Sequence, residues 1–351
     1  MMQTLPYGTV IAFALIGCGH SDSDPRADAA TGDSAELREN GTGEADSESG
    51  ADVSCTTAHC PTVVASKQPG AWALAIDAHN LYWTTSASGI GTGTVVALSL
   101  TGHVPVTLAS NQSDPVAIVV DAARVYWVTD GILPRTGEVL SAPVDGGALT
   151  TVVSGQSHPS SVAVDSTTLY WTNGDGEVLS AAKTGGTVST LSTGQQFVSN
   201  VLTDSSNIYW TNWDGSGNGI GSLMRLPKSG GDAQTLTSGD VAPAGLAMDA
   251  TSLYWTTDNL SKIALDGGAT TTLANGLSQA GRLGIFQSAV YWVEDGPLTG
   301  AGDVKSVPIV GGSPATIASS QRSPVSVVVE PGEAVYWTDS EGGTVMRSNF
   351  H

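Results

Sequence analysis

Residues 161–191 read SVAVDSTTLYWTNGDGEVLSAAKTGGTVSTL. This stretch contains four short segments rich in β-branched and aromatic residues, at 161–164, 169–172, 177–181 and 187–191. Asp165 and the pair Gly185-Gly186 separate them, and both favour tight turns, because an Asp side chain caps its own turn and Gly adopts positive φ. Four short antiparallel strands in about 40 residues are typical of one blade of a β-propeller.

The same unit returns along the chain. A Tyr-Trp dipeptide occurs seven times, at intervals of 37 to 45 residues, beginning at Tyr82, Tyr126, Tyr170, Tyr209, Tyr254, Tyr291 and Tyr336. An Asp stands five residues before the Tyr in the first five repeats, whereas Phe286 and Pro331 hold this position in the last two. The repeats predict seven blades. A solenoid is excluded, because its parallel strands need no tight hairpins.

The two ends of the repeat region predict how the ring closes. The last repeat stops in its third strand, at 346–350, and lacks a fourth. Residues 62–65 (TVVA) match residues 151–154 (TVVS), which form a fourth strand in their own repeat. We therefore expect an all-β, seven-bladed β-propeller over residues 55–351, closed by an N-terminal strand that completes the last blade and removes both sheet edges. An open six-blade array with a ragged end is the alternative.

The Tyr-Trp pairs are predicted to be core residues. Neighbouring residues of a strand point to opposite faces, and each blade is covered on both faces by other blades. Seven evenly spaced copies indicate packing between sheets and not a stacking site for a cofactor.

The motif itself resembles that of a known family. Tyr336-Trp337-Thr338-Asp339 is a full match to the repeat of YWTD propellers of the lipoprotein-receptor type (LDL-receptor class B-like), and the pairs at Tyr82, Tyr170 and Tyr209 are near matches. The chain is similar in particular to bacterial lipoproteins that carry such repeats. Receptor propellers of this type have six blades and this chain has seven, so no receptor partner is carried over.

The N-terminus resembles a sorting signal. A short apolar segment at 9–17 is too short to span a membrane and ends in Leu15-Ile16-Gly17-Cys18, which resembles the lipobox of bacterial lipoproteins. The resemblance implies a signal peptide over residues 1–18, diacylation of Cys18 and, with Gly19 next, an outer-membrane destination on the periplasmic or surface side. A buried Cys in an ordinary strand is the alternative. We expect a lipid-anchored protein of the bacterial cell envelope.

Residues 19–54 are predicted to be a disordered acidic linker. They hold ten acidic and two basic residues and almost no large apolar ones, so they cannot bury enough surface to fold. Cys55 and Cys60 follow, and in an exported chain this spacing predicts a local disulfide. A zinc site would need more ligands than His59 adds.

Composition excludes several classes of function. The chain has 33 acidic and 13 basic residues among 351, a formal net charge of −20, which argues against nucleic-acid binding. No apolar run is long enough to span a bilayer, so membrane contact is expected only through the lipid anchor. His79 and His103 are assigned to one face of the ring and His158 to the other, and neither a Gly-x-Ser-x-Gly elbow nor a His-x-x-x-His pair occurs. A non-enzymatic protein without cofactors is expected, with Ca²⁺ left open.

Variation between repeats is confined to one face. The distance from the Gly turn to the next Tyr is almost constant, whereas the loop between the second and third strands runs long at 86–93, 130–137, 213–221 and 294–302. In a propeller these loops share a face with the connections between blades, such as 155–159. Binding residues concentrate on loops carried by a rigid scaffold.

Acidic and aromatic residues gather on that predicted face. The ligand-binding candidates are Trp72, Asp130, Asp175, Trp213, Asp214, Asp258, Glu294, Asp295 and Asp339. Turn capping and solubility are the competing interpretation for the acids, and a plain lid on the channel is the one for Trp72. The sequence thus predicts a monomeric, envelope-anchored binding module for an envelope protein, a peptide or a glycan. The alternatives are a structural or assembly scaffold of the envelope and a Ca²⁺-dependent hydrolase or lyase.

Overall fold

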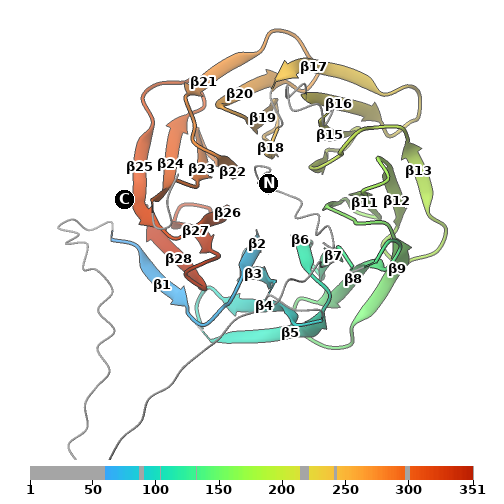
Figure 1. The fold of residues 1–351 in the computed structure, drawn as a ribbon, viewed down its shortest axis with the longest axis horizontal. Helices are drawn as coiled ribbons and strands as arrows, with labels where there is room; N and C mark the ends of the chain where they lie inside the picture. The colour runs from blue at the N-terminus through green and yellow to red at the C-terminus, as the bar shows by residue number, and fades with distance from the viewer. Residues whose placement is uncertain are drawn as a thin grey trace, which may run out of the picture. The chain divides into compact units, whose positions relative to one another are not determined.

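The computed structural model describes residues 60–86, 91–102, 104–131, 133–213, 221–240, 243–296 and 301–350, with the backbone alone for Asp240. Within these residues the chain forms seven four-stranded antiparallel sheets around a central axis (Figure 1). The described part contains no helix that is long and apolar enough to cross a membrane. The predicted all-β, seven-bladed propeller is confirmed. The predicted signal peptide, linker and residues Cys18 and Cys55 lie outside the described residues.

Each blade begins with its innermost strand, next to the central axis (Figure 1). Blade 1 contains β2 (Ala71–Ile76), β3 (Asn80–Thr85), β4 (Gly93–Ser99) and β5 (Pro105–Gln112). Blade 2 contains β6 (Pro115–Val120), β7 (Arg124–Thr129), β8 (Gly137–Pro143) and β9 (Thr150–Gln156). Blade 3 contains β10 (Ser161–Val164), β11 (Thr168–Thr172), β12 (Val178–Ala182) and β13 (Ser189–Ser192). Blade 4 contains β14 (Val201–Thr203), β15 (Asn207–Trp213), β16 (Gly221–Pro227) and β17 (Gln234–Asp240).

The remaining blades follow the same order. Blade 5 contains β18 (Gly245–Met248), β19 (Ser252–Thr256), β20 (Asn259–Ala264) and β21 (Thr271–Asn275). Blade 6 contains β22 (Ala280–Phe286), β23 (Ala289–Glu294), β24 (Gly302–Pro308) and β25 (Ala315–Gln321). Blade 7 contains β26 (Pro324–Glu330), β27 (Ala334–Asp339), β28 (Thr344–Asn349) and, as its outer strand, β1 (Thr62–Ala65).

The ring closes through β1, as the sequence predicts. β1 runs antiparallel to β28, with Thr62 opposite Arg347 and Val63 opposite Met346. The first described strand thus supplies the fourth strand of the last blade, and the two ends of the repeat region meet in one sheet (Figure 1). This pairing excludes the open six-blade array.

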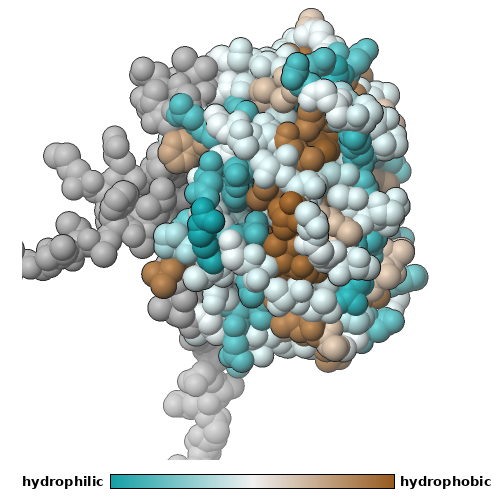
Figure 2. Space-filling model, turned by 90° about the vertical axis from the view of Figure 1, so that its right-hand side faces the viewer, coloured by the Kyte–Doolittle hydropathy of each residue, from teal (hydrophilic) through white to brown (hydrophobic). Residues whose placement is uncertain are grey.

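The core lies between the blades. All seven Trp side chains of the Tyr-Trp pairs are at most 1% exposed. In one apolar cluster Tyr126 and Val128 of blade 2 pack with Leu169 and Trp171 of blade 3, which shows that the clusters join neighbouring sheets. Burial of one such aromatic side chain stabilises the fold by about 2–3 kcal/mol. The exterior seen in Figure 2 is mainly hydrophilic or neutral, with a narrow apolar strip.

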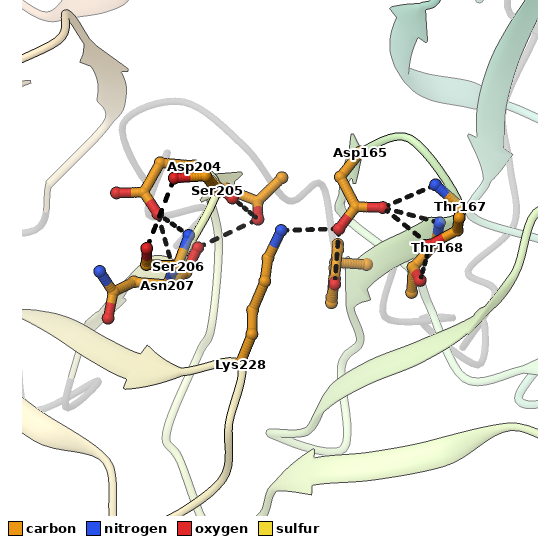
Figure 3. Close-up of polar contacts among 10 residues, drawn as sticks. Asp165, Thr167, Thr168, Asp204, Ser205, Ser206, Asn207 and Lys228 are labelled. Atoms are coloured by element: carbon orange, nitrogen blue, oxygen red, sulfur yellow. Dashed lines mark hydrogen bonds and ion pairs between the residues drawn. The ribbon is translucent and has the colours of Figure 1, made fainter.

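The turns between first and second strands are capped by the repeated Asp. The Oδ1 atom of Asp165 accepts hydrogen bonds from the backbone N–H groups of Thr167 and Thr168 at 2.9 and 2.8 Å, and its Oδ2 accepts one from the Tyr170 hydroxyl at 2.9 Å (Figure 3). Burial and this carboxylate raise the pKa of Tyr170 to about 12. Equivalent caps form at Asp77, Asp121, Asp204 and Asp249.

Lysine side chains form ion pairs between two of these capping Asp residues and the neighbouring blades. Lys228 Nζ of blade 4 lies 2.6 Å from Asp165 Oδ2 of blade 3 (Figure 3), and Lys183 Nζ of blade 3 lies 2.5 Å from Asp121 Oδ2 of blade 2. Burial opposes ionisation of Asp165, but the ammonium and the backbone N–H groups outweigh it and hold its pKa well below the usual range. This face, which we call the turn face, is therefore occupied by structural contacts.

Candidate binding face

The loop face is the opposite face of the ring, where each second strand ends and each inner strand begins. In six of the seven repeats the residue four positions after the Tyr donates a backbone hydrogen bond to the connection that precedes its blade. Examples are Asp130 N to Asp114 O at 2.9 Å and Ser340 N to Ser323 O at 3.1 Å. The loops and the connections that the sequence places on one face are thus joined there.

Polar pairs close the gaps between several blades on this face. The side chain of the residue four positions after the Tyr contacts the connection that follows its blade. His158 Nδ1 lies 2.9 Å from Asp130 Oδ1, and Ser323 Oγ donates to Asp295 Oδ2 at 3.4 Å. Ser86 Oγ makes the same kind of contact with the Asp114 carboxylate. Burial raises the pKa of Asp130, although His158 opposes the shift.

The other predicted acids differ in exposure. Asp175 and Asp258 are exposed, and Asp175 Oδ1 accepts a hydrogen bond from Ser157 Oγ at 3.1 Å. Asp339 is only 5% exposed, and its Oδ1 has no hydrogen-bond partner. Desolvation raises the pKa of Asp339 to about 7, against the opposing effect of the Arg322 backbone N–H, which donates to Oδ2 at 3.4 Å. Asp214 lies outside the described residues.

The role of Glu294 depends on a set of hydrogen bonds from the buried Trp indoles, which the sequence motifs do not predict. In four blades the buried indole Nε1 donates to a Gln that ends the preceding outer strand or follows it, as in Trp127 to Gln112 at 2.9 Å and Trp171 to Gln156 at 2.8 Å. The same bond joins Trp83 to Gln68 and Trp337 to Gln321. We call these contacts the Trp–Gln bonds. They hold each of these blades to the outer strand before it.

Blade 6 lacks the Gln, because Leu277 occupies its place. Glu294 Oε1 accepts the Trp292 Nε1 hydrogen bond instead, at 2.7 Å, and Lys305 Nζ lies 2.7 Å from Glu294 Oε2. Glu294 is only 6% exposed. Its carboxylate is thus engaged inside the fold on both oxygens.

Trp213 belongs to an aromatic pair. Its ring lies 5.3 Å from that of Phe197, tilted by 41°. Phe197 is 51% exposed, and its backbone has φ 39°, in the left-handed region that bulky residues rarely adopt. Trp213 Nε1 is buried and has no hydrogen-bond partner.

The position of Phe197 within the repeat makes it unusual. In each connection between blades we count from the position that holds the Gln of the Trp–Gln bonds. Two residues later the backbone has positive φ in six connections, at Gly70, Asp114, His158, Phe197, Gln279 and Ser323. Phe197 is the apolar member of this described set. In the preceding blade the position four residues after the Tyr is Gly174, which has no side chain to form a polar pair. The spacing from the Gln was the signal in the sequence that identifies Phe197.

Trp72 lies at the start of inner strand β2, as the sequence predicts. It is half-buried and packs against the cluster between blades 1 and 2, beside Ala73 and Ile118. Its backbone carbonyl accepts a hydrogen bond from the Thr338 hydroxyl at 2.8 Å.

Cys60 is disulfide-bonded. Its pairing with Cys55 stays a prediction.

The loop face contains no metal-binding cluster in the part of the chain that the structure describes. No group of three or more His, Cys, Asp or Glu side chains there could hold a metal ion. His158 is engaged by Asp130 on this face. The arrangement suits binding by exposed aromatic and polar groups.

Comparisons with known proteins support the fold. No protein-family model and no curated protein matches the sequence. Many solved structures are similar, among them a structural genomics protein of unknown function from Bacteroides thetaiotaomicron VPI-5482. That likeness has a TM-score of 0.53 at 14% sequence identity and covers 83% of this chain and 72% of the other. At this identity the comparison shows a shared propeller architecture and no more.

Proposed function

We propose that this protein is a non-enzymatic binding module that captures a glycan or an extended peptide on the loop face, centred on Phe197 and Trp213. The lipobox-like segment ending at Cys18 supports placement at the bacterial cell envelope by a lipid anchor. In that setting the acidic segment 19–54 serves as a spacer between the membrane and the propeller.

The aromatic pair, in which Phe197 is exposed and Trp213 is half-buried, carries the proposal. Phe197 occupies a strained position where the equivalent residues are Gly, Asp, His, Gln and Ser, so its apolar ring has a cost to the fold. Half of its surface nevertheless faces solvent. Aromatic faces next to polar groups bind sugar rings and peptide side chains through stacking and burial.

The acidic residues contribute less to this surface than the sequence suggests. Glu294 and Asp339 are buried, and Asp130 and Asp295 bond to neighbouring connections. Four of the described acidic candidates are thus buried or bonded within the fold, which favours stacking over capture of a cationic ligand by charge. Asp175 and Asp258 are the exposed carboxyls of the described candidates.

The test is a binding screen with matched variants. Wild-type protein is applied to arrays of bacterial envelope oligosaccharides and of peptides, and each hit is remeasured with Phe197→Ala. We expect the affinity for a true ligand to fall by about tenfold or more, since loss of one aromatic contact costs on the order of 1–2 kcal/mol.

The control is Val310→Ala, which removes an 84% exposed apolar side chain from the turn face. Its affinities should equal those of the wild type. Hits that bind Phe197→Ala as tightly as wild type would contradict the aromatic site. An absence of any hit would instead favour the scaffold function, in which the propeller is held by the tether and takes no ligand on this face.

A further inference from the structure

One inner-strand position recurs around the central axis at the loop-face end of the ring, which we call the mouth of the central channel. In each blade one residue of the inner strand pairs with the core Trp of the second strand, and the position meant here is the residue that precedes it in the sequence. From blade 1 to blade 7 the residues at this position are Ala73, Ala117, Ser161, Asn200, Gly245, Arg282 and Ser326. We call these seven residues the mouth layer. They lie near the start of each inner strand, on the side of the loop face.

Most polar members of this layer bond to the next blade. Ser161 Oγ accepts from Val201 N at 3.1 Å, and Asn200 Nδ2 donates to Ala244 O at 3.0 Å. Ser326 Oγ accepts from the backbone N–H of Leu74 at 3.3 Å. Side chains at this position therefore point along the inner edge of the ring, towards the neighbouring inner strand.

Arg282 does not follow this pattern. Its Nη2 donates to Val116 O at 2.9 Å, and Val116 belongs to β6 of blade 2, not to neighbouring blade 7. Two blades, 7 and 1, lie between β22 and β6 on one side of the ring, and three blades lie between them on the other side. The two strands therefore face each other across the centre of the ring (Figure 1). The Arg282 side chain thus crosses the mouth of the channel.

The guanidinium of Arg282 has no counter-charge among the described residues. Lys183, Lys228 and Lys305 all pair with carboxylates, whereas Arg282 forms no ion pair there and makes one hydrogen bond, to a neutral carbonyl. A guanidinium has five N–H donors, so four are left without a protein acceptor in the described part. Desolvation lowers the pKa of Arg282 to about 10, and the group stays cationic at neutral pH.

Arg282 is partly buried, and a partly buried cation without a counter-charge is costly to a fold. None of the described acidic residues pairs with it. A planar guanidinium with free donors matches an anionic oxygen group, which it binds through two parallel hydrogen bonds. We propose that the mouth of the channel binds a small oxyanion, a carboxylate or a phosphate, through Arg282. This site is independent of the aromatic pair and does not require the proposed glycan or peptide ligand.

The experiment follows the Arg282 Nε–H signal by NMR in the full-length ¹⁵N-labelled protein, with the signal assigned by its loss in Arg282→Lys. Sodium citrate and sodium phosphate are titrated separately at constant ionic strength, balanced with sodium chloride. A saturable shift with citrate identifies a carboxylate ligand, and one with phosphate identifies a phosphate ligand. Either result supports the site.

Variants separate a binding role from a purely structural one. Arg282→Gln should abolish anion-dependent stabilisation against heat, and Arg282→Lys should weaken binding at least tenfold, because an ammonium lacks the bidentate fork. Arg135→Met, which removes an exposed loop-face guanidinium, should respond like wild type. Absence of a saturable shift with both anions would overturn the proposal, even if the variants fail to fold. Unchanged binding in Arg282→Gln would do the same.

Discussion

Asp339 is a loop-face carboxyl whose charge depends on pH in the neutral range. Its folded pKa is about 7, raised by desolvation, whereas an Asp in an unfolded chain titrates near about 3.9. The folded state therefore holds this proton more tightly than the unfolded state does. Stability from this group is fully present below about pH 4 and is lost as pH rises to about 7.

Asp339→Asn should remove this dependence. Because the amide stays neutral, the variant should gain about 2–3 kcal/mol relative to wild type between about pH 5 and about pH 8. Urea denaturation at both pH values measures the gain. Asp175→Asn, at an exposed carboxyl of the same face, is the control and should show no such gain. An equal difference at both pH values would mean that Asp339 is ionised in the folded protein throughout.

Phe197 offers a test of strain in the backbone. Phe197→Ala and Phe197→Gly lose the same ring, but Gly adopts φ 39° without steric conflict. We expect Phe197→Gly to be more stable than Phe197→Ala by about 1 kcal/mol. Thermal or urea denaturation measures the difference. Equal stabilities would show that the left-handed backbone is not strained at this residue.

Between the elements, the Trp–Gln bonds join four of the blades to the outer strand before each of them. Gln156→Leu would leave the buried Trp171 Nε1 without an acceptor, and we expect it to cost about 1–3 kcal/mol of unfolding free energy. Gln195→Leu, in the connection before blade 4, is the matched control. There Gln195 Oε1 accepts from Asn212 Nδ2 at 2.7 Å, and Trp210 Nε1 already has no partner. A cost at Gln195 as large as at Gln156 would contradict the importance of the indole bond.

The strands themselves were largely predictable. The expected segments 62–65 and 161–164 coincide with β1 and β10, and 177–181 is shifted by one residue from β12. The position of such strands depends on local features of the sequence, namely the alternation of apolar and polar residues and the Asp and Gly residues at the turns. The Trp–Gln bonds could have been found from the recurrence of Gln about 15 residues before Trp. The Arg282 contact could not, because it joins residues 166 positions apart and depends on the curvature of the whole ring.

At the scale of the molecule, stability depends on the pairing of β1 with β28. Val63→Pro should weaken this ladder, because proline has no N–H to donate and fixes φ within the short strand. We expect a loss on the order of 2 kcal/mol or more and concentration-dependent self-association through the freed edge of β28. Denaturation and light scattering measure the two effects. A monomer of wild-type stability would show that β1 is dispensable for closure.

The same closure sets the order of events during synthesis. Thr62 Oγ1 of β1 donates to the Arg347 carbonyl, 285 positions further along the chain. Contacts so distant in sequence form slowly, because the loop between them must be ordered first. β1 leaves the ribosome among the earliest residues of the propeller, yet it finds its partner only when β28 has emerged. The growing chain thus carries an unpaired strand until the last blade has been synthesised, and this strand is open to non-native contacts in that interval.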